Sequence, residues 1–179
     1  MQKSSFGPLG AAMSSATTPS AGIDQARMRQ VMGHFATGVT VVTAIHDGAP
    51  VGMACQSFTS LSLEPAYISI APALTSTTYP RVRAAGRFVV NILAEDQQDV
   101  CRAMGRSGGD KFVGVDWAPA GNGAPRLAGA VAWIECDIAH ELPGGDHVIV
   151  IGAVTALDLP RDAAPLMFHK GRYARLIAE

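Results

Sequence analysis

The chain has 179 residues, of which 48% are hydrophobic and 16% charged, and its formal net charge is −1. This composition predicts one folded domain and excludes the basic surface of a nucleic-acid-binding protein, and no apolar run reaches the roughly 18 residues of a membrane helix. The three cysteines are scattered without a CxxC pair, which argues against a disulfide framework or a zinc site and fits a reducing, cytoplasmic compartment.

The N-terminal residues differ in composition from the rest of the chain. Residues 1–22 are rich in alanine, serine, glycine and proline, so we expect a disordered tail before one domain over 23–179. This stretch lacks the continuous apolar core of a signal peptide. Asp24 is a candidate N-cap for a helix over 24–36 that Gly38 ends. The apolar residues at helical spacing are Met28, Val31, Met32 and Phe35.

The pattern then changes to that of strands and turns. Residues 39–45 are β-branched and apolar, and Asp47-Gly48 is a hairpin turn that leads into a strand beginning at 51–54. A short helix over 77–85 is expected to close at Gly86. The remaining elements of this half are strands over 66–71 and 88–93 and a helix over 95–104.

The second half is predicted to begin with a loop and to continue as long strands. Residues 105–125 are rich in glycine and proline and are expected to form the loop. Strands over 130–141 and 147–157 follow, and residues 165–176 are expected to form a short strand or turn with exposed aromatic and basic groups. Roughly five to seven strands with two or three helices predict a mainly β fold, a closed antiparallel barrel with flanking helices.

Four polar segments are candidates for a binding site. Residues 52–60 carry small and hydroxyl side chains, either for a polar ligand or as an ordinary strand end. Residues 75–78 precede a helix, as an anion site or as a plain N-cap run. Residues 144–147 form a close backbone approach with a histidine beside an aspartate, or a simple hairpin turn. Residues 169–173 offer donors and a ring, or form a solvated chain end.

Several kinds of site are not predicted. No GxSxG elbow, Walker loop or GxGxxG fingerprint is present, so a bound nicotinamide cofactor would not bind in the Rossmann manner. His34 and His46 are expected to be structural or exposed. Because the histidines have no acidic partners at ligand spacing, no metal site is predicted.

A series of short motifs follows in order along residues 25–176. They are FATGVTVVT at 35–43, GMACQSF at 52–58, SLSLEP at 60–65, AGRFVVNIL at 85–93, DKF at 110–112, GGDH at 144–147 followed by Gly152, and FHKGRY at 168–173. In this order and spacing they resemble the flavin reductase-like, FMN-binding split-barrel family. The resemblance implies an antiparallel split β-barrel of Greek-key type with flanking helices.

The resemblance also implies an activity. Family members are mostly homodimers that reduce FMN or FAD with NADH or NADPH and release the reduced flavin. The branch most similar to this chain serves flavin-dependent monooxygenases. We therefore expect a flavin reductase that uses NADH, since no arginine cluster suited to the 2′-phosphate of NADPH is evident. FAD is slightly favoured over FMN, because Leu74 stands where many relatives carry Lys or Arg, two residues before Ser76.

The resemblance assigns roles to residues by position. The flavin-binding set comprises Thr37, Met53, Ala54, Cys55, Gln56, Ser57, Ser62, Ser76, Thr78, Arg87, Phe88, Lys111 and Phe112. The nicotinamide set comprises His147, Arg172 and Tyr173. His147 is the candidate catalytic residue, expected to position the nicotinamide in preference to shuttling a proton, and both roles stay open. Cys55 is either a redox-active thiol or a packed, inert one.

Two rival functions remain open. The first is a flavin-dependent oxidase of the pyridoxamine-phosphate type, which would keep its flavin bound and pass electrons to oxygen. The second is a flavin-binding electron carrier that is not an enzyme. Consumption of NADH with excess flavin separates them, because only a reductase oxidises NADH catalytically and releases the flavin.

Overall fold

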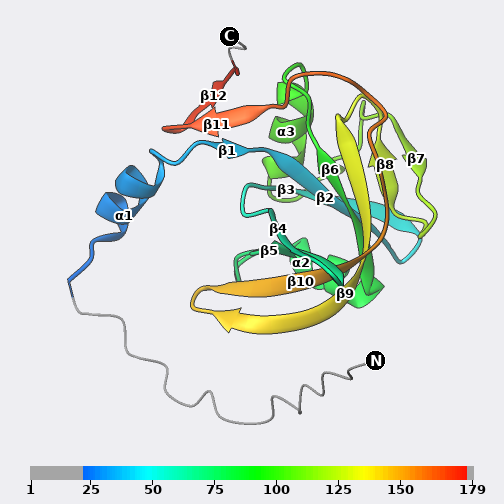
Figure 1. Ribbon diagram of the computed structural model, residues 1–179, viewed down its shortest axis with the longest axis horizontal. Coiled ribbons are helices and arrows are strands. Elements are labelled where there is room, and N and C mark those ends of the chain that lie inside the picture. Colours follow the sequence, from blue (N-terminus) through cyan, green and yellow to red (C-terminus); the bar gives the residue numbers. More distant parts are fainter. Residues whose placement is uncertain (1–21, 177–179) are drawn as a thin grey trace, which may run out of the picture.

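Most of the regular secondary structure in the described chain consists of antiparallel strands (Figure 1). The structure is a computed structural model that describes residues 22–176, so the tail expected over 1–22 lies, apart from Gly22, outside the described residues. Seven strands form one sheet in the order β3-β2-β6-β9-β10-β5-β4. They are β2 (Thr40–His46), β3 (Ala49–Cys55), β4 (Thr59–Leu63), β5 (Ala66–Ile70), β6 (Arg87–Ile92), β9 (Ala132–Gly144) and β10 (His147–Asp158).

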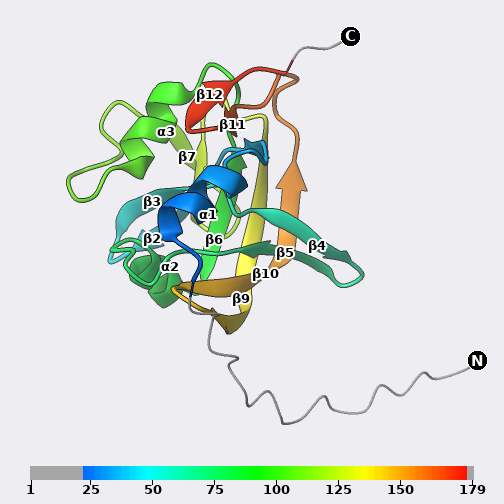
Figure 2. The ribbon, with the colours of Figure 1, turned by 90° about the vertical axis from the view of Figure 1, so that its left-hand side faces the viewer.

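The main sheet forms a split barrel. Its strands share one buried cluster, with Val42, Val51, Ile68, Phe88, Cys136 and Val150 coming from six different strands. The edge strands β3 and β4 follow one another in the chain, but no ladder joins them within residues 22–176. Figure 2 shows the β4–β5 hairpin reaching out beyond the rest of the sheet. The split barrel implied by the resemblance is therefore confirmed, whereas the closed barrel predicted from the strand pattern is wrong.

Three helices accompany the sheet in the described part of the chain: α1 (Gln25–Met32), α2 (Tyr79–Ala85) and α3 (Gln98–Gly105). The predicted cap of α1 is confirmed, because the Asp24 carboxylate accepts a hydrogen bond from the N–H of Arg27 at 3.1 Å. The helix ends at Gly33 and not at Gly38. The chain turns there, and the carbonyl of Gly33 accepts a hydrogen bond from the N–H of Lys170. No helix of residues 22–176 is long and apolar enough to cross a membrane.

A second core cluster lies on the other face of β2. It includes Val39, Val41, Leu93, Met104, Phe112 and Leu166, so β2 is buried on both faces, as its unbroken apolar run predicts. The C-terminal hairpin of β11 (Met167–His169) and β12 (Arg172–Ala174) pairs with β1 (Thr37–Gly38) and packs on this cluster. The ring centroids of Phe168 and Tyr173 are 5.7 Å apart. The expectation of exposed aromatic groups in this segment is therefore wrong.

Four short strands were absent from the sequence prediction: β1, β4, β7 and β8. Strand β4 has mostly exposed residues, so it shows no burial pattern. The predicted loop over 105–125 contains β7 (Trp117–Pro119), which pairs with β8 (Pro125–Leu127). The buried side chain of Asn91 holds this hairpin, since its Oδ1 accepts a hydrogen bond from the N–H of Leu127 at 2.8 Å and its Nδ2 donates to the carbonyl of Val41 at 3.2 Å.

Gly152 marks a point of close packing inside the barrel. A Cβ atom added there would lie 2.8 Å from Cζ of Phe88 and 3.2 Å from Cβ of Cys136. Both neighbours are buried and cannot move into solvent. We expect Gly152→Ala to lower the free energy of unfolding, measured by urea denaturation, by about 1–3 kcal/mol, because overpacking forces side chains off their rotamers or shifts the backbone.

Gly38→Ala is the matched control, because an added Cβ would meet no atom within 4 Å there. Its free energy of unfolding should stay within about 0.5 kcal/mol of that of the parent chain. An equal loss in both variants would contradict the packing argument and would point to a backbone effect of replacing glycine.

Candidate functional site

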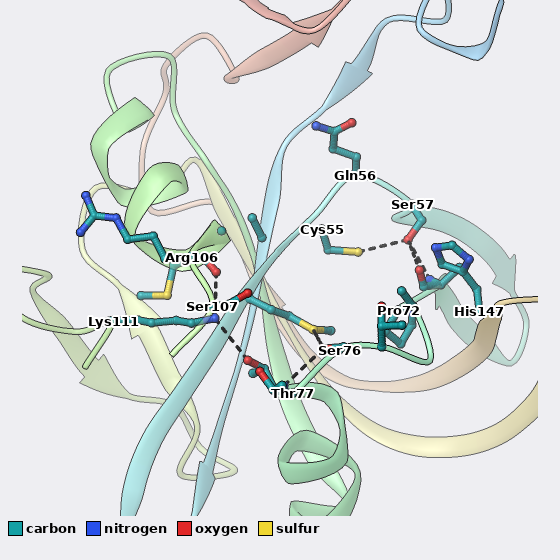
Figure 3. Close-up of a pocket in the computed structure, with 18 residues that line it drawn as sticks. Cys55, Gln56, Ser57, Pro72, Ser76, Thr77, Arg106, Ser107, Lys111 and His147 are labelled. Atoms are coloured by element: carbon teal, nitrogen blue, oxygen red, sulfur yellow. Dashed lines mark hydrogen bonds between the residues drawn. The ribbon is translucent and has the colours of Figure 1, made fainter. Parts of the chain in front are cut away.

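A pocket of about 470 Å³ opens beside the end of β3 (Figure 3). Its volume lies within the range of small-molecule and cofactor sites. We call it the main pocket; it is lined by residues 53–57, 71–73, 75–78 and 104–107, together with Lys111 and His147. These segments are distant in the sequence and meet because β3, β5 and β10 belong to one sheet, while α3 packs against β3.

Ser57 ties together two strand ends in the main pocket. Its Oγ accepts a hydrogen bond from the N–H of Ala71 at 2.8 Å and lies 3.2 Å from Sγ of Cys55 (Figure 3). Ser57 follows β3 and Ala71 follows β5, so this hydroxyl holds the two segments at a fixed separation. The Cys55 side chain is buried beneath them.

The segment before α2 is organised by Ser76. Its Oγ accepts hydrogen bonds from the N–H groups of Thr78 at 3.3 Å and Tyr79 at 3.1 Å, so these amides are already paired. The Tyr79 hydroxyl donates to Glu141 on β9, whose carboxylate also lies 2.7 Å from Nε of Arg83. Burial and the Glu141 carboxylate raise the pKa of Tyr79 far above its ordinary value. The phenol therefore stays a donor that anchors α2 on the sheet.

Lys111 supplies a positive charge at the edge of the main pocket. Its Nζ donates to the carbonyls of Gly52 and Met104, each at 3.1 Å, and to Oγ1 of Thr78 at 3.2 Å. These three oxygens come from β3, α3 and the start of α2. Partial burial, and then the charge of Arg81, lower the pKa of Lys111. The hydrogen bonds compensate for the loss of water around the ammonium group.

His147 lies on the opposite side of the main pocket, at the start of β10. Its Nδ1 is 2.7 Å from Oδ1 of Asp146, and this hydrogen bond lowers the pKa of the Asp146 carboxyl. Because Nδ1 is engaged by Asp146, Nε2 is the ring nitrogen left for a ligand. The backbone holds the histidine in place, since the carbonyl of Asp146 accepts from the N–H of Leu74 and the carbonyl of Pro72 accepts from the N–H of Val148.

Comparison with known proteins decides the family. The model of the family described as "Flavin reductase like domain" matches residues 32–176. This chain belongs to that family. HsaB of Rhodococcus jostii, the reductase subunit of a flavin-dependent monooxygenase, is 45% identical over 151 residues, which cover 84% of this chain and 77% of that protein.

Solved structures of the flavin reductase family agree with this fold. Nitrilotriacetate monooxygenase component B from Mycobacterium thermoresistibile superimposes with a TM-score of 0.83 at 42% identity, over 86% of this chain and 87% of that one. The NADH:FAD oxidoreductase SgcE6 of Streptomyces globisporus, in complex with NAD and FAD fragments, has a TM-score of 0.82 at 37% identity, over 86% and 93% of the two chains.

Nine residues that the flavin reductase resemblance selects line the main pocket. They are Met53, Ala54, Cys55, Gln56, Ser57, Ser76, Thr78, Lys111 and His147. The structure thus brings together three of the polar segments noted in the sequence, which are those around 52–60, 75–78 and 144–147.

Other predicted residues of the flavin reductase site lie elsewhere in the single chain. Phe88 is completely buried in the core, and Phe112 borders a neighbouring pocket. Arg172 and Tyr173 line a separate small pocket at the C-terminal hairpin. Burial and a hydrogen bond with Cys101 raise the pKa of Tyr173 to about 12. The three remaining residues, which do not line the main pocket, are Thr37, Ser62 and Arg87.

The prediction missed two segments that line the main pocket of this flavin reductase-like chain, residues 71–73 and residues 104–107. Residues 104–107 at the end of α3 line it, including Arg106 and Ser107. The available clue was the polar, glycine-rich run that follows α3, which was interpreted only as a loop. In the part of the chain that the structure describes, no three His, Cys, Asp or Glu side chains form a group that could hold a metal ion.

The Ser57 hydrogen bond can be tested by truncation. We expect Ser57→Ala to lower the free energy of unfolding by about 0.5–1.5 kcal/mol, because the N–H of Ala71 loses its partner at an exposed position. Urea denaturation provides the measurement. Ser60→Ala is the control, since Ser60 is exposed on β4 and its side chain has no hydrogen bond within residues 22–176. Equal stability of the two variants would show that water replaces the lost hydroxyl.

Proposed function

We propose that this chain is a flavin reductase that oxidises NADH, passes hydride to FAD or FMN and supplies the reduced flavin to a partner monooxygenase. The observation that carries the proposal is the main pocket, where the 53–57 segment, the hydroxyls of 75–78, Lys111 and His147 line one cavity. Membership of the flavin reductase-like family supports it, as do relatives named as reductase subunits of flavin-dependent monooxygenases.

The groups in the main pocket suit a flavin. Met53, Ala54 and Cys55 offer an apolar surface for a flat ring, and the hydroxyls of Ser57 and residues 75–78 suit a ribityl chain. Lys111 provides a cation for a phosphate. Bound flavin supplies a ring that accepts hydride from a reduced nicotinamide, chemistry that no side chain provides. The task of the protein is to hold the two rings in the orientation that hydride transfer needs. This orientation accounts for most of the lowering of the activation barrier.

The preference for particular cofactors follows from charges around the main pocket. Leu74 is 63% exposed and gives the 71–78 loop no cation for the terminal phosphate of FMN. This supports FAD over FMN. Arg106 is the one arginine among the described residues that line the main pocket, which is fewer than a cluster suited to the 2′-phosphate of NADPH. This supports NADH.

We further propose that the protein works as a homodimer in the cytoplasm. Helix α1 buries none of its own residues, and Met28, Val31, Met32 and Phe35 at its end are between 49% and 74% exposed. An apolar group of this kind on a surface is typical of a site that another chain covers. The cysteines Cys55, Cys101 and Cys136 are free, which fits a reducing compartment.

The first test of the proposed function is turnover. Purified protein, mixed with NADH and excess FAD, should oxidise many equivalents of NADH, followed by absorbance of the reduced nicotinamide. Oxidation of a single equivalent would indicate an electron carrier. Turnover that depends on oxygen and proceeds with flavin that stays bound through gel filtration would indicate an oxidase. Omission of flavin is the control and should abolish the reaction.

The second test concerns His147. We expect His147→Ala to raise the KM for NADH by roughly three- to tenfold, the effect of losing one hydrogen bond, with little change in flavin affinity. Steady-state kinetics and flavin titration measure the two quantities. His140→Ala is the control, because His140 is exposed on β9 and does not line the main pocket. An unchanged KM for NADH would remove His147 from nicotinamide positioning.

A further inference from the structure

A pocket of about 560 Å³ lies apart from the main pocket, beside the β7–β8 hairpin. We call it the hairpin pocket; it is lined by residues 116–118, 126–130 and 160–161, together with Trp133 on β9. No residue lines both the hairpin pocket and the main pocket. Figure 1 shows β7 and β8 on the opposite side of the molecule from α1, where the proposed homodimer has its contact. The flavin and the second copy therefore do not account for the hairpin pocket.

One face of the β7–β8 hairpin carries two opposite charges into the hairpin pocket. Arg126 pairs with Ala118 in the strand register, and the N–H of Ala128 donates to the carbonyl of Asp116 two positions further along. Because side chains alternate between the faces of a strand, Asp116 and Arg126 lie on the same face as diagonal neighbours. They form no ion pair within residues 22–176. The positive and the negative group of this face are therefore not joined directly.

Arg126 is the cation that a ligand of the hairpin pocket can reach. Its Cζ lies 4.3 Å from the centroid of the Trp133 ring, and its Nη2 donates to the carbonyl of Pro119 at 3.0 Å. Its other N–H groups form no hydrogen bond within residues 22–176. An arginine carries five donors in a planar fork that matches the geometry of a carboxylate. Because stacking on Trp133 fixes the plane of this fork, the remaining donors are preorganised for a planar anion.

Arg161 also lines the hairpin pocket, but its charge is already neutralised. Its Nη1 and Nη2 donate to the two carboxylate oxygens of Asp96 at 3.0 Å and 2.7 Å, and Nη1 also donates to the carbonyl of Gly129 at 3.1 Å. Gly129 has φ of +76°, and an added Cβ would lie 3.3 Å from Nε2 of Gln97, so the position suits glycine alone. Among the described residues that line the hairpin pocket, Arg126 is thus the one arginine without a carboxylate partner.

The rest of the lining of the hairpin pocket is mainly apolar. Trp133 is half-buried and offers an aromatic surface, and Leu127, Ala130 and Pro160 add apolar contacts. A surface of this kind binds a flat ring, and a few polar groups then fix the orientation of the ring. Because one free cation stands beside one carboxylate, that of Asp116, the charges suit a ligand with a single negative charge better than a phosphate.

We propose that the hairpin pocket binds a planar aromatic carboxylate, with Arg126 holding the carboxylate and the apolar lining holding the ring. This site goes beyond the proposed flavin reductase function and does not depend on it, because the hairpin pocket shares no residue with the main pocket. Asp116 lies on the same face as Arg126 and repels the ligand, so it limits the affinity and disfavours ligands with more than one negative charge.

Titration with benzoate tests the proposal, since benzoate combines a flat ring with one carboxylate. The chain has two tryptophans, Trp117 and Trp133, and both line the hairpin pocket. Their indole N–H signals in a heteronuclear NMR spectrum of the full-length protein therefore report binding, and we expect them to shift and to saturate. Arg126→Met should raise the Kd for benzoate by about tenfold, the effect of losing a charge-assisted hydrogen bond.

Arg83→Met is the matched control for Arg126→Met. Arg83 is largely exposed in its surface pair with Glu141 and does not line the hairpin pocket, so its replacement should leave the Kd for benzoate unchanged. Equal weakening by the two arginine variants would overturn the role of Arg126.

Asp116→Asn distinguishes the proposed site from a damaged fold. It removes the negative charge beside Arg126, so the Kd for benzoate should fall by about two- to fivefold, whereas a damaged fold would weaken binding in both variants. The Kd for benzamide, which has the same ring without the charge, should not respond to Asp116→Asn. Absence of saturable shifts, equal Kd values for the parent chain and Arg126→Met, or shifts confined to residues of the main pocket would overturn the proposal.

Discussion

The arrangement of the site depends on the hydrogen bonds that the ammonium group of Lys111 donates. It joins the carbonyl of Gly52 on β3, the carbonyl of Met104 in α3 and the hydroxyl of Thr78 before α2. A cation removed from water is stable only where oxygens replace its hydration, so the three elements must converge for Lys111 to fold inward. The same convergence forms the wall between the main pocket and the neighbouring pocket that Phe112 borders. The Lys111 side chain therefore holds three elements together and also lines the main pocket.

Local chemistry could be predicted from the sequence, and long-range placement could not. The cap at Asp24, the left-handed glycine at Gly86 and the buried strand around Val41 follow from short-range rules, and the structure contains all three. The contact between Lys111 and Gly52 joins residues 59 positions apart, and no periodic pattern in the sequence indicates it. Strand β4 was missed because a strand with exposed faces lacks the alternation that marks burial.

The candidate site shows the same division. Hydroxyl-rich and glycine-rich segments marked most of the main pocket, because a polar ligand needs such groups wherever the fold places them. Their order resembled a known family, and that resemblance selected candidate positions which composition alone left open. Phe88 illustrates the limit of transfer by position. It stands next to an exposed arginine in the motif, yet its ring packs against Gly152 in the core. Neighbours in a motif can therefore lie in different surroundings, one exposed and the other in the core.

The junction between the β9–β10 hairpin and the 71–74 loop bears on how the protein exchanges its ligands. Two backbone hydrogen bonds, from Leu74 to Asp146 and from Val148 to Pro72, fasten the strand that carries His147 to the loop that precedes the hydroxyls of 75–78. These bonds hold the two rims of the main pocket at a fixed separation. Little conformational entropy remains to be lost when a ligand enters, because folding has already ordered both rims. A preformed rim of this kind lets a ligand bind without the cost of ordering the loop.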